Sequence, residues 1–464
     1  MRHREDLTIA INLDRRAGRP LPEQLADQLR AAIDAGMLAR HTRMPSTRTL
    51  GTRLQVSRGV TVAAYDLLCG RGYVEGRHGS GTYVAAGPVP APRPGPAPMP
   101  DERPDDLVDL TPGQPCAEAF PLPAWRAAWR RASYQRPPTG RLPAHGLPQL
   151  RHAIAAHLAG TRRAVPAGHQ VVVTTGAAHS LRIVLAALGH RGAAVAIEDP
   201  VPPELRRAAT HGTAGPLPLP VDGQGARLDA VRPGCAVVVL SAEAHVPLGH
   251  VLSTPRRRAV ADWAGRTGGH VVEIAAETVP RPTGPDPLSR LLDAAGRARF
   301  VLVGGFGALL TPSLHLGYAV VPRDLAGQLA VDLADSPEQP SYLTQLAVAD
   351  LLAGGVLRRL TRRLAGIDAR KRQLVRAVLE PLRGRVELVA LDAVGTVGLR
   401  LPHGPSAGRA AGELARRGLL VHTLGRYCGP AGPAADALLL GYPQLPDPAL
   451  RGALTRLTDV LTHL

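Results

Sequence analysis

A run of alternating prolines is the feature that most limits how this chain can fold. Gly87–Arg103 reads GPVPAPRPGPAPMPDER. Proline removes the backbone N–H and fixes φ, so such a run favours extended backbone and prevents both helix formation and sheet pairing. We therefore predict a semi-rigid Pro-rich linker over residues 87–104, which joins a small N-terminal domain, residues 1–86, to a much larger C-terminal part.

The N-terminal part has the pattern of three helices followed by a hairpin. Leu25, Leu29 and Ile33 recur at helical spacing, and Gly36 follows them as a stop signal. Ser46 and Ser57 stand where two further helices would begin, each as an N-cap residue. The predicted helices cover 21–36, 46–54 and 58–69, and the predicted strands cover 72–75 and 82–85. This order is that of a winged helix-turn-helix.

Charge is distributed unevenly across this part. From Ala35 to Tyr65 there is no Asp or Glu, although five arginines fall in the same stretch. An acid-free basic stretch over two short helices can lie along a phosphate backbone. The whole chain has a formal net charge of +17 and a single lysine, Lys371. Because basic residues are common everywhere, an ordinary solvated surface is the alternative interpretation.

Motifs in this stretch closely resemble the winged helix-turn-helix of GntR-family bacterial transcription regulators. They are Pro45-Ser46-Thr47-Arg48-Thr49-Leu50, Val56-Ser57-Arg58 and the wing Gly79-Ser80-Gly81-Thr82. The resemblance implies contacts with a double-stranded DNA operator by Arg43, Ser46, Arg48, Ser57, Arg58, Gly79 and Thr82. Where the family often has Asn-Thr after Ser-Arg, this chain has Gly59-Val60. We predict that Thr61 supplies part of the lost DNA contact.

The C-terminal part alternates short apolar runs with helical segments. The predicted strands are 170–174, 193–197, 236–240, 270–273, 300–303 and 318–321, and a smaller set follows at 396–401, 418–422 and 437–440. Strands that alternate with helices indicate a mainly parallel sheet covered by helices. We therefore predict an α/β fold with a large domain over residues 105–384 and a smaller α/β subdomain over residues 385–464.

This part resembles the fold-type-I, pyridoxal phosphate (PLP)-dependent aminotransferases nearly end to end. Segments such as DLTPGQP, QVVVTTGAAHSL, VPLGHVLSTPRRRAVADWA and LTPSLHLGYAVVP stand in the family order. A GntR-type reader joined to such a domain resembles the MocR-type regulators. The resemblance implies a DNA-binding transcription regulator, a homodimer whose two readers favour paired half-sites.

The residues that would bind and activate PLP differ from the family pattern. Ala308 stands at the position of the lysine that forms the Schiff base, and Gly307 and His315 replace the serine and arginine that hold the phosphate. Ala275 stands where an aspartate pairs with the pyridinium nitrogen. Each lost charge-assisted contact is worth roughly 1.5–3 kcal/mol. We therefore expect no covalent PLP, poor noncovalent PLP binding, and no transaminase activity.

Lys371 is the one lysine that could replace the missing amine. It lies in the segment ARKRQLVRAVL, among many arginines. The charge pattern predicts a solvated helix face. A basic surface that touches DNA or the partner subunit is the alternative, and nothing in the sequence places Lys371 in the cofactor pocket.

A pocket without its former cofactor is the remaining prediction. By the resemblance it is bounded by Gly176, Ala177, His179, His245, Ala275, Ala308 and His315. The three histidines could bind an unknown small-molecule effector, or could simply be packed or solvated. The four widely spaced cysteines show no metal-ligand pattern, so we expect no metal.

Three other functions stay open beside an effector-sensing regulator. They are a regulator that responds to noncovalent PLP, a PLP-dependent aminotransferase with an appended reader, and a ligand-free repressor whose sheet domain only holds the dimer together. No run of about 18 apolar residues and no secretory signal stand out, so we expect a cytoplasmic protein without a membrane partner.

Overall fold

The computed structural model describes residues 9–15, 18–77, 81–85, 107–160, 165–188, 194–211, 215–277, 287–292, 299–334, 336, 338–390, 393–402, 405–430 and 436–464. The chain forms two compact units, Met1–Arg103 and Pro104–Leu464, which are described separately. The predicted linker lies outside the described residues, as does Gly79 in the wing. No helix in the described ranges is long and apolar enough to cross a bilayer.

The N-terminal unit has the predicted order of elements. It contains α1 (Leu21–Asp34), α2 (Thr47–Arg53), α3 (Arg58–Gly70), β1 (Val74–Arg77) and β2 (Gly81–Val84). The two strands pair antiparallel, with Val74 opposite Val84. Leu25, Leu50 and Leu68 from the three helices meet in one buried core. This core holds the three helices and the hairpin together, as in a winged helix.

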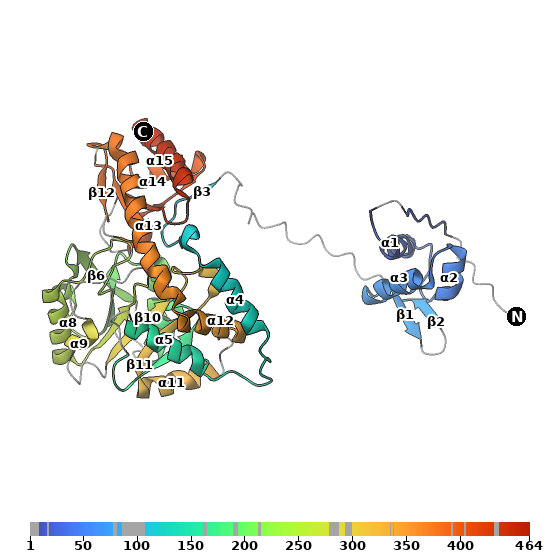
Figure 1. Ribbon diagram of the computed structural model, residues 1–464, viewed down its shortest axis with the longest axis horizontal. Coiled ribbons are helices and arrows are strands. Elements are labelled where there is room, and N and C mark those ends of the chain that lie inside the picture. Colours follow the sequence, from blue (N-terminus) through green and yellow to red (C-terminus); the bar gives the residue numbers. More distant parts are fainter. Residues whose placement is uncertain are drawn as a thin grey trace. The chain divides into compact units, whose positions relative to one another are not determined.

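An eight-stranded sheet forms the centre of the C-terminal unit (Figure 1). Its order is β4 (His169–Thr174), β11 (Gly317–Pro322), β10 (Phe300–Gly305), β9 (His270–Ile274), β8 (Cys235–Leu240), β5 (Ala194–Asp199), β6 (Pro216–Asp222) and β7 (Gly225–Ala226). The five strands from β10 to β6 are mutually parallel. The antiparallel strand β11 separates β4 from β10. The sheet is therefore mainly parallel, as predicted.

Helices cover both faces of this sheet, each over its own apolar core. They are α4 (Leu122–Ser133), α5 (Pro148–Gly160), α6 (Ala177–Ala187), α7 (Pro203–Thr210), α8 (Thr254–Thr267), α9 (Leu288–Leu291), α11 (Arg323–Ala334), α12 (Tyr342–Ala353) and α13 (Val356–Leu379). Leu150, Trp263 and Val348 belong to one core, and Leu181, Leu205 and Leu329 belong to the other. Burial on both faces explains why the central strands are continuous apolar runs.

A smaller sheet forms the C-terminal end of this unit. Its order is β12 (Glu387–Val389), β13 (Thr396–Arg400), β16 (Ala437–Gly441) and β15 (His422–Thr423), and α14 (Ala407–Arg416) and α15 (Asp447–Thr462) pack with it. The long helix α13 connects the two sheet regions, as Figure 1 shows, because its last turns pack Val375 and Leu379 into the smaller core.

Two details differ from the sequence-based prediction. Strand β3 (Val108–Asp109) pairs with β14 (Leu419–Leu420), and Leu110 packs in the smaller core, so the segment after residue 105 lies with the C-terminal subdomain. Strand β6 was not predicted, because it carries three alternating prolines. The carbonyl of Pro220 points away from β5 and accepts a hydrogen bond from Arg227 N. The alternating prolines therefore have their backbone nitrogens on the side away from β5, where pairing with β5 needs no N–H donor.

Candidate functional site

The first turns of α2 and α3 form the candidate DNA interface. Ser46 caps α2, because its Oγ accepts a hydrogen bond of 3.1 Å from Thr49 N. Ser57 precedes α3 and makes no capping bond with its side chain, so its exposed hydroxyl is available to a ligand. Free N–H groups at two helix starts beside hydroxyl groups are a suitable environment for phosphate.

Three arginines surround these helix starts. Arg48 and Arg58 lie on the first turns of α2 and α3 and are exposed, and neither forms an ion pair within the described residues. Arg43 forms an isolated bridge with Tyr83 of the wing, and its Nε would lie 3.3 Å from a Cβ built on Gly81. The predicted contacts Arg43, Arg48 and Arg58 are therefore on the surface, while Thr82 is half-buried.

Thr61 does not have the predicted DNA-facing position. Its side chain is completely buried, and its Oγ1 donates to Thr47 O at 2.8 Å and lies 2.9 Å from Arg58 O. The hydroxyl thus joins α3 to the first residue of α2. The prediction that Thr61 contacts DNA directly is therefore wrong, because its side chain is enclosed between the two helices and links them.

A cavity of about 490 Å³ opens at the carboxyl ends of strands in the large sheet. Six of the seven predicted pocket residues line it, namely Gly176, Ala177, His245, Ala275, Ala308 and His315. They stand at the start of α6 and in the segments after β8, β9 and β10. Crevices at this edge of an open α/β sheet are the usual place for a ligand.

His179 is the predicted pocket residue that does not line this cavity. It is buried in the first turn of α6, and its Nδ1 accepts a bond of 3.1 Å from Thr175 N. The ring proton is therefore assigned to Nε2, which lies 3.4 Å from a carboxylate oxygen of Glu338. Burial lowers the pKa of His179 below its ordinary value. Its bond with Thr175 fixes the turn before α6.

A buried acid that the sequence analysis did not identify also lines the cavity. Glu277 follows β9 and accepts a hydrogen bond from the hydroxyl of Tyr318, and its other oxygen lies 3.8 Å from His157 Nε2. All three side chains are buried. The only available signal was an acidic residue just beyond a strand, at the edge of the sheet where ligands bind.

A second buried acid, Glu198, lies at the end of β5 beside His245. Its Oε2 accepts from Ser241 N at 2.8 Å and lies 3.9 Å from His245 Nε2, whereas its Oε1 has no hydrogen-bond partner among the described residues. Burial raises the pKa of Glu198 to about 8, with a further contribution from Glu273. Burial lowers the pKa of His245 to about 3, and its Nε2 donates to Pro200 O at 2.9 Å. At neutral pH both groups are therefore predominantly uncharged.

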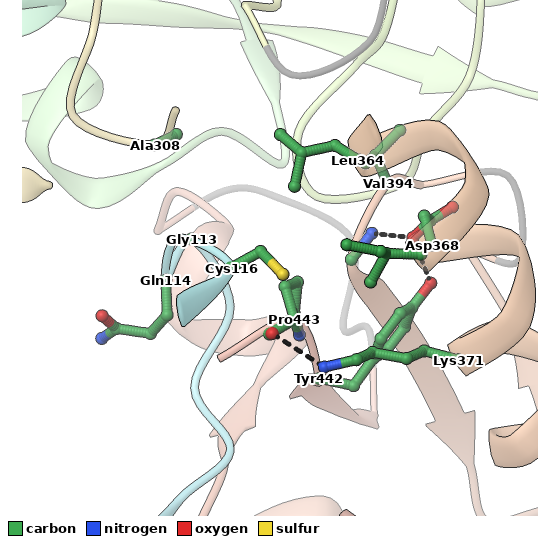
Figure 2. Close-up of a pocket in the computed structure, with 12 residues that line it drawn as sticks. Gly113, Gln114, Cys116, Ala308, Leu364, Asp368, Lys371, Val394, Tyr442 and Pro443 are labelled. Carbon is green, nitrogen blue, oxygen red and sulfur yellow. Dashed lines mark hydrogen bonds between the residues drawn. The ribbon is translucent and has the colours of Figure 1, made fainter. Parts of the chain in front are cut away.

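Lys371 is not on a solvated helix face, so that prediction is wrong. Its side chain is fully buried and donates to Pro443 O at 3.0 Å (Figure 2). It also donates to Leu445 O. It lines a small cavity of about 60 Å³, which also touches Ala308 and holds at most a few water molecules. The arginines Arg358, Arg359 and Arg362 of the same helix are exposed as predicted.

The described lining of the larger cavity supplies no amine for a Schiff base. Lys371 is the only lysine of the chain, and its Nζ points to the carbonyls of the 443–445 loop. Within the described residues, the polar side chains around this cavity are Thr175, Glu204, His245, Glu277, His315 and Thr396. This set does not fit PLP as a covalently held cofactor, because nothing in it can condense with an aldehyde.

Comparisons with known proteins agree with the two units. Residues 21–84 match the bacterial regulatory proteins of the gntR family, and residues 105–390 match aminotransferase class I and II. The HTH-type pyridoxine biosynthesis transcriptional regulator PdxR of Corynebacterium glutamicum is 31% identical, over 98% of this chain and 99% of that protein. The probable rhizopine catabolism regulatory protein MocR of Rhizobium meliloti is 32% identical, over 78% of each chain.

Solved structures give the same result for the C-terminal unit. The multiple substrate aminotransferase from Thermococcus profundus superposes with a TM-score of 0.68 and 16% identity, over 77% of this chain and 92% of that one. At this identity the likeness shows the fold alone.

A winged helix with an aminotransferase-like domain defines a class of bacterial transcription regulators. The chain belongs to the GntR family, in its MocR/PdxR-type group.

Proposed function

We propose that the chain is a dimeric DNA-binding regulator whose C-terminal domain binds a small effector other than PLP and carries out no transamination. The observation that carries this proposal is the position of the only lysine. Lys371 is buried outside the larger cavity and bonded to main-chain carbonyls, while Ala308 lines that cavity. Without an amine in the cavity, an aminotransferase has no route to its covalent cofactor.

Absorbance tests the enzymatic part of this proposal. Purified protein incubated with PLP is expected to show no Schiff-base band that hydroxylamine removes, and no amino-group transfer with a panel of amino acids. A hydroxylamine-sensitive band would contradict the proposal. Lys371→Met would then show whether the band arises at Lys371, because no other lysine exists.

The DNA-binding part rests on the exposed arginines at the starts of α2 and α3. Arg48→Ala and Arg58→Ala are each expected to weaken binding to the protein's own promoter region in a gel shift, by about five- to a hundredfold. Arg30→Ala on α1 is the matched control, because Arg30 is a half-buried arginine of the same unit that pairs with Asp27. Unchanged affinity and salt dependence in both variants would refute the interface.

Two readers in one dimer would bind paired half-sites, as expected for this class of reader. An effector regulates such a dimer only if it binds two arrangements of the molecule with different affinity. Thermal stability scanned against a metabolite panel separates a sensor from a scaffold. A ligand that raises the melting temperature and changes operator affinity supports the sensor. If no compound changes the melting temperature, only the dimerisation role remains for the C-terminal domain.

A further inference from the structure

Residues 9–15 form a short N-terminal arm that two glutamines of α1 hold in place. Gln28 Oε1 accepts from Asn12 N at 2.9 Å, and Gln28 Nε2 donates to Asn12 O at 2.6 Å. Gln24 pairs with the backbone of Asp14 in the same way, at 3.0 and 2.9 Å. Each side-chain amide thus supplies both the acceptor and the donor that a neighbouring strand would provide. The arm is therefore fastened to α1 at two points.

The last residue of the arm reaches the turn between α2 and α3. Arg15 Nη2 donates to Gln55 O at 2.7 Å, across 40 positions of the sequence. Gln55 lies in the left-handed region, with φ of 52°, where any residue with a Cβ is strained and glycine is usual. The side chain of Gln55 is exposed, so its own packing does not enforce this conformation. The bond from Arg15 is a contact that stabilises the strained turn.

This turn decides where α3 begins. Gln55 stands two residues before Ser57, which occupies the N-cap position of α3. A rotation of the backbone at Gln55 would move the start of the helix, and with it the exposed Arg58. Side chains that read base edges must be placed to within about 0.5 Å, whereas contacts with phosphate depend mainly on charge. The conformation of Gln55 therefore matters most for recognition of sequence.

We propose that Arg15 is a positioning residue of the DNA reader, which directs α3 by holding the turn at Gln55 in its left-handed conformation. The inference rests on the proposed function, because it assigns a further residue to operator recognition. Without this bond the turn relaxes, and only the molecules that keep the left-handed conformation read the operator. The strain of that conformation in a residue with a side chain corresponds to a factor of about five in their number.

Operator and non-operator DNA separate positioning from charge. Gel shifts compare the protein's own promoter region with a scrambled fragment of the same length and base composition. Arg15→Ala is expected to weaken binding to the promoter about fivefold and to change binding to the scrambled fragment by less than about twofold. Thermal unfolding followed by circular dichroism shows that each variant is folded at the assay temperature.

Arg19→Ala is the matched control for this comparison. Arg19 is exposed and lines the same open groove as Arg15, beside the start of α3. It pairs with Glu23 and Asp27 of α1 rather than with the turn. The ratio of promoter affinity to scrambled-fragment affinity should therefore stay at the value of the unsubstituted protein.

A second substitution in the turn tests the route by which Arg15 acts. Gln55→Gly removes the strain of the left-handed conformation, and it removes no buried side chain. Alone, it should change promoter affinity by less than about twofold. In the double variant Arg15→Ala/Gln55→Gly, promoter affinity should return to within about twofold of the unsubstituted protein.

Three results would overturn the inference. They are an unchanged promoter affinity in Arg15→Ala, an equal loss on both DNA fragments, and a loss that Gln55→Gly does not restore. The second would make Arg15 an ordinary phosphate contact. Arg48→Ala in the same gel shift tests the interface itself. A weakened Arg48→Ala beside an unchanged Arg15→Ala would refute this inference and leave the regulator proposal standing.

Discussion

Replacing Lys371 with methionine is expected to destabilise the C-terminal unit by about 3 kcal/mol. The ammonium group donates to two main-chain carbonyls, Pro443 O at 3.0 Å and Leu445 O, and lies 3.8 Å from Glu118 Oε2. Hydrogen bonds to a charged group contribute about 1.5–3 kcal/mol each. Methionine recovers part of this loss, because it keeps the apolar stem and removes the cost of burying a charge.

Tryptophan fluorescence measures this loss in one unit of the full chain. Trp125, Trp129 and Trp263 all lie in the C-terminal unit, so a denaturant titration followed by fluorescence reports that unit. Arg376→Met is the matched control, because Arg376 lies on the same helix and is exposed. A loss below about 1 kcal/mol would refute the reasoning, since such a value is typical of an exposed cation.

Three further predictions concern buried or closely packed positions, and the first two use the same fluorescence titration. Burial raises the pKa of Glu198 to about 8, so the folded protein holds this acid protonated at neutral pH. Between about pH 6.5 and pH 8 the free energy of unfolding of the unsubstituted protein should therefore fall by about 2 kcal/mol more than that of Glu198→Gln. The same pH dependence in both proteins would contradict this. Gly317→Ala should cost over 1 kcal/mol, since the added Cβ would lie 2.5 Å from Gly176 Cα, unlike the unobstructed Gly327→Ala. Thr61→Val should lower the thermal stability of the N-terminal unit, followed by circular dichroism, and retention of both stability and operator affinity would refute its linking role.

The sequence predicts the helices of the reader well because each has a local signal at its start. Ser46 occupies the N-cap position of α2 and makes the expected bond. The central strands are equally clear, since burial on both faces makes them continuous apolar runs. Strand β6 escapes prediction because alternate prolines hide it, and only its place near the sheet edge makes them tolerable.

Positions that depend on tertiary contacts were harder to predict. In the sequence Thr61 resembles a surface residue of a recognition helix, but its hydroxyl donates a hydrogen bond to Thr47 O of the neighbouring helix. Lys371 follows Ile367 and precedes Val375 at steps of four, so it lies on the apolar stripe of α13. That spacing was a usable signal, and the surrounding arginines concealed it. Glu277 lies beside Tyr318 and His157, both of which are distant from it in sequence.

The burial of Lys371 leaves amine-directed reagents without a side-chain target on the folded surface. Every other basic side chain apart from histidine is an arginine, so acylating and cross-linking compounds can reach an ε-amine only when α13 separates from the 443–445 loop. The rate of lysine modification therefore measures how often the contact between Lys371 and the 443–445 loop opens.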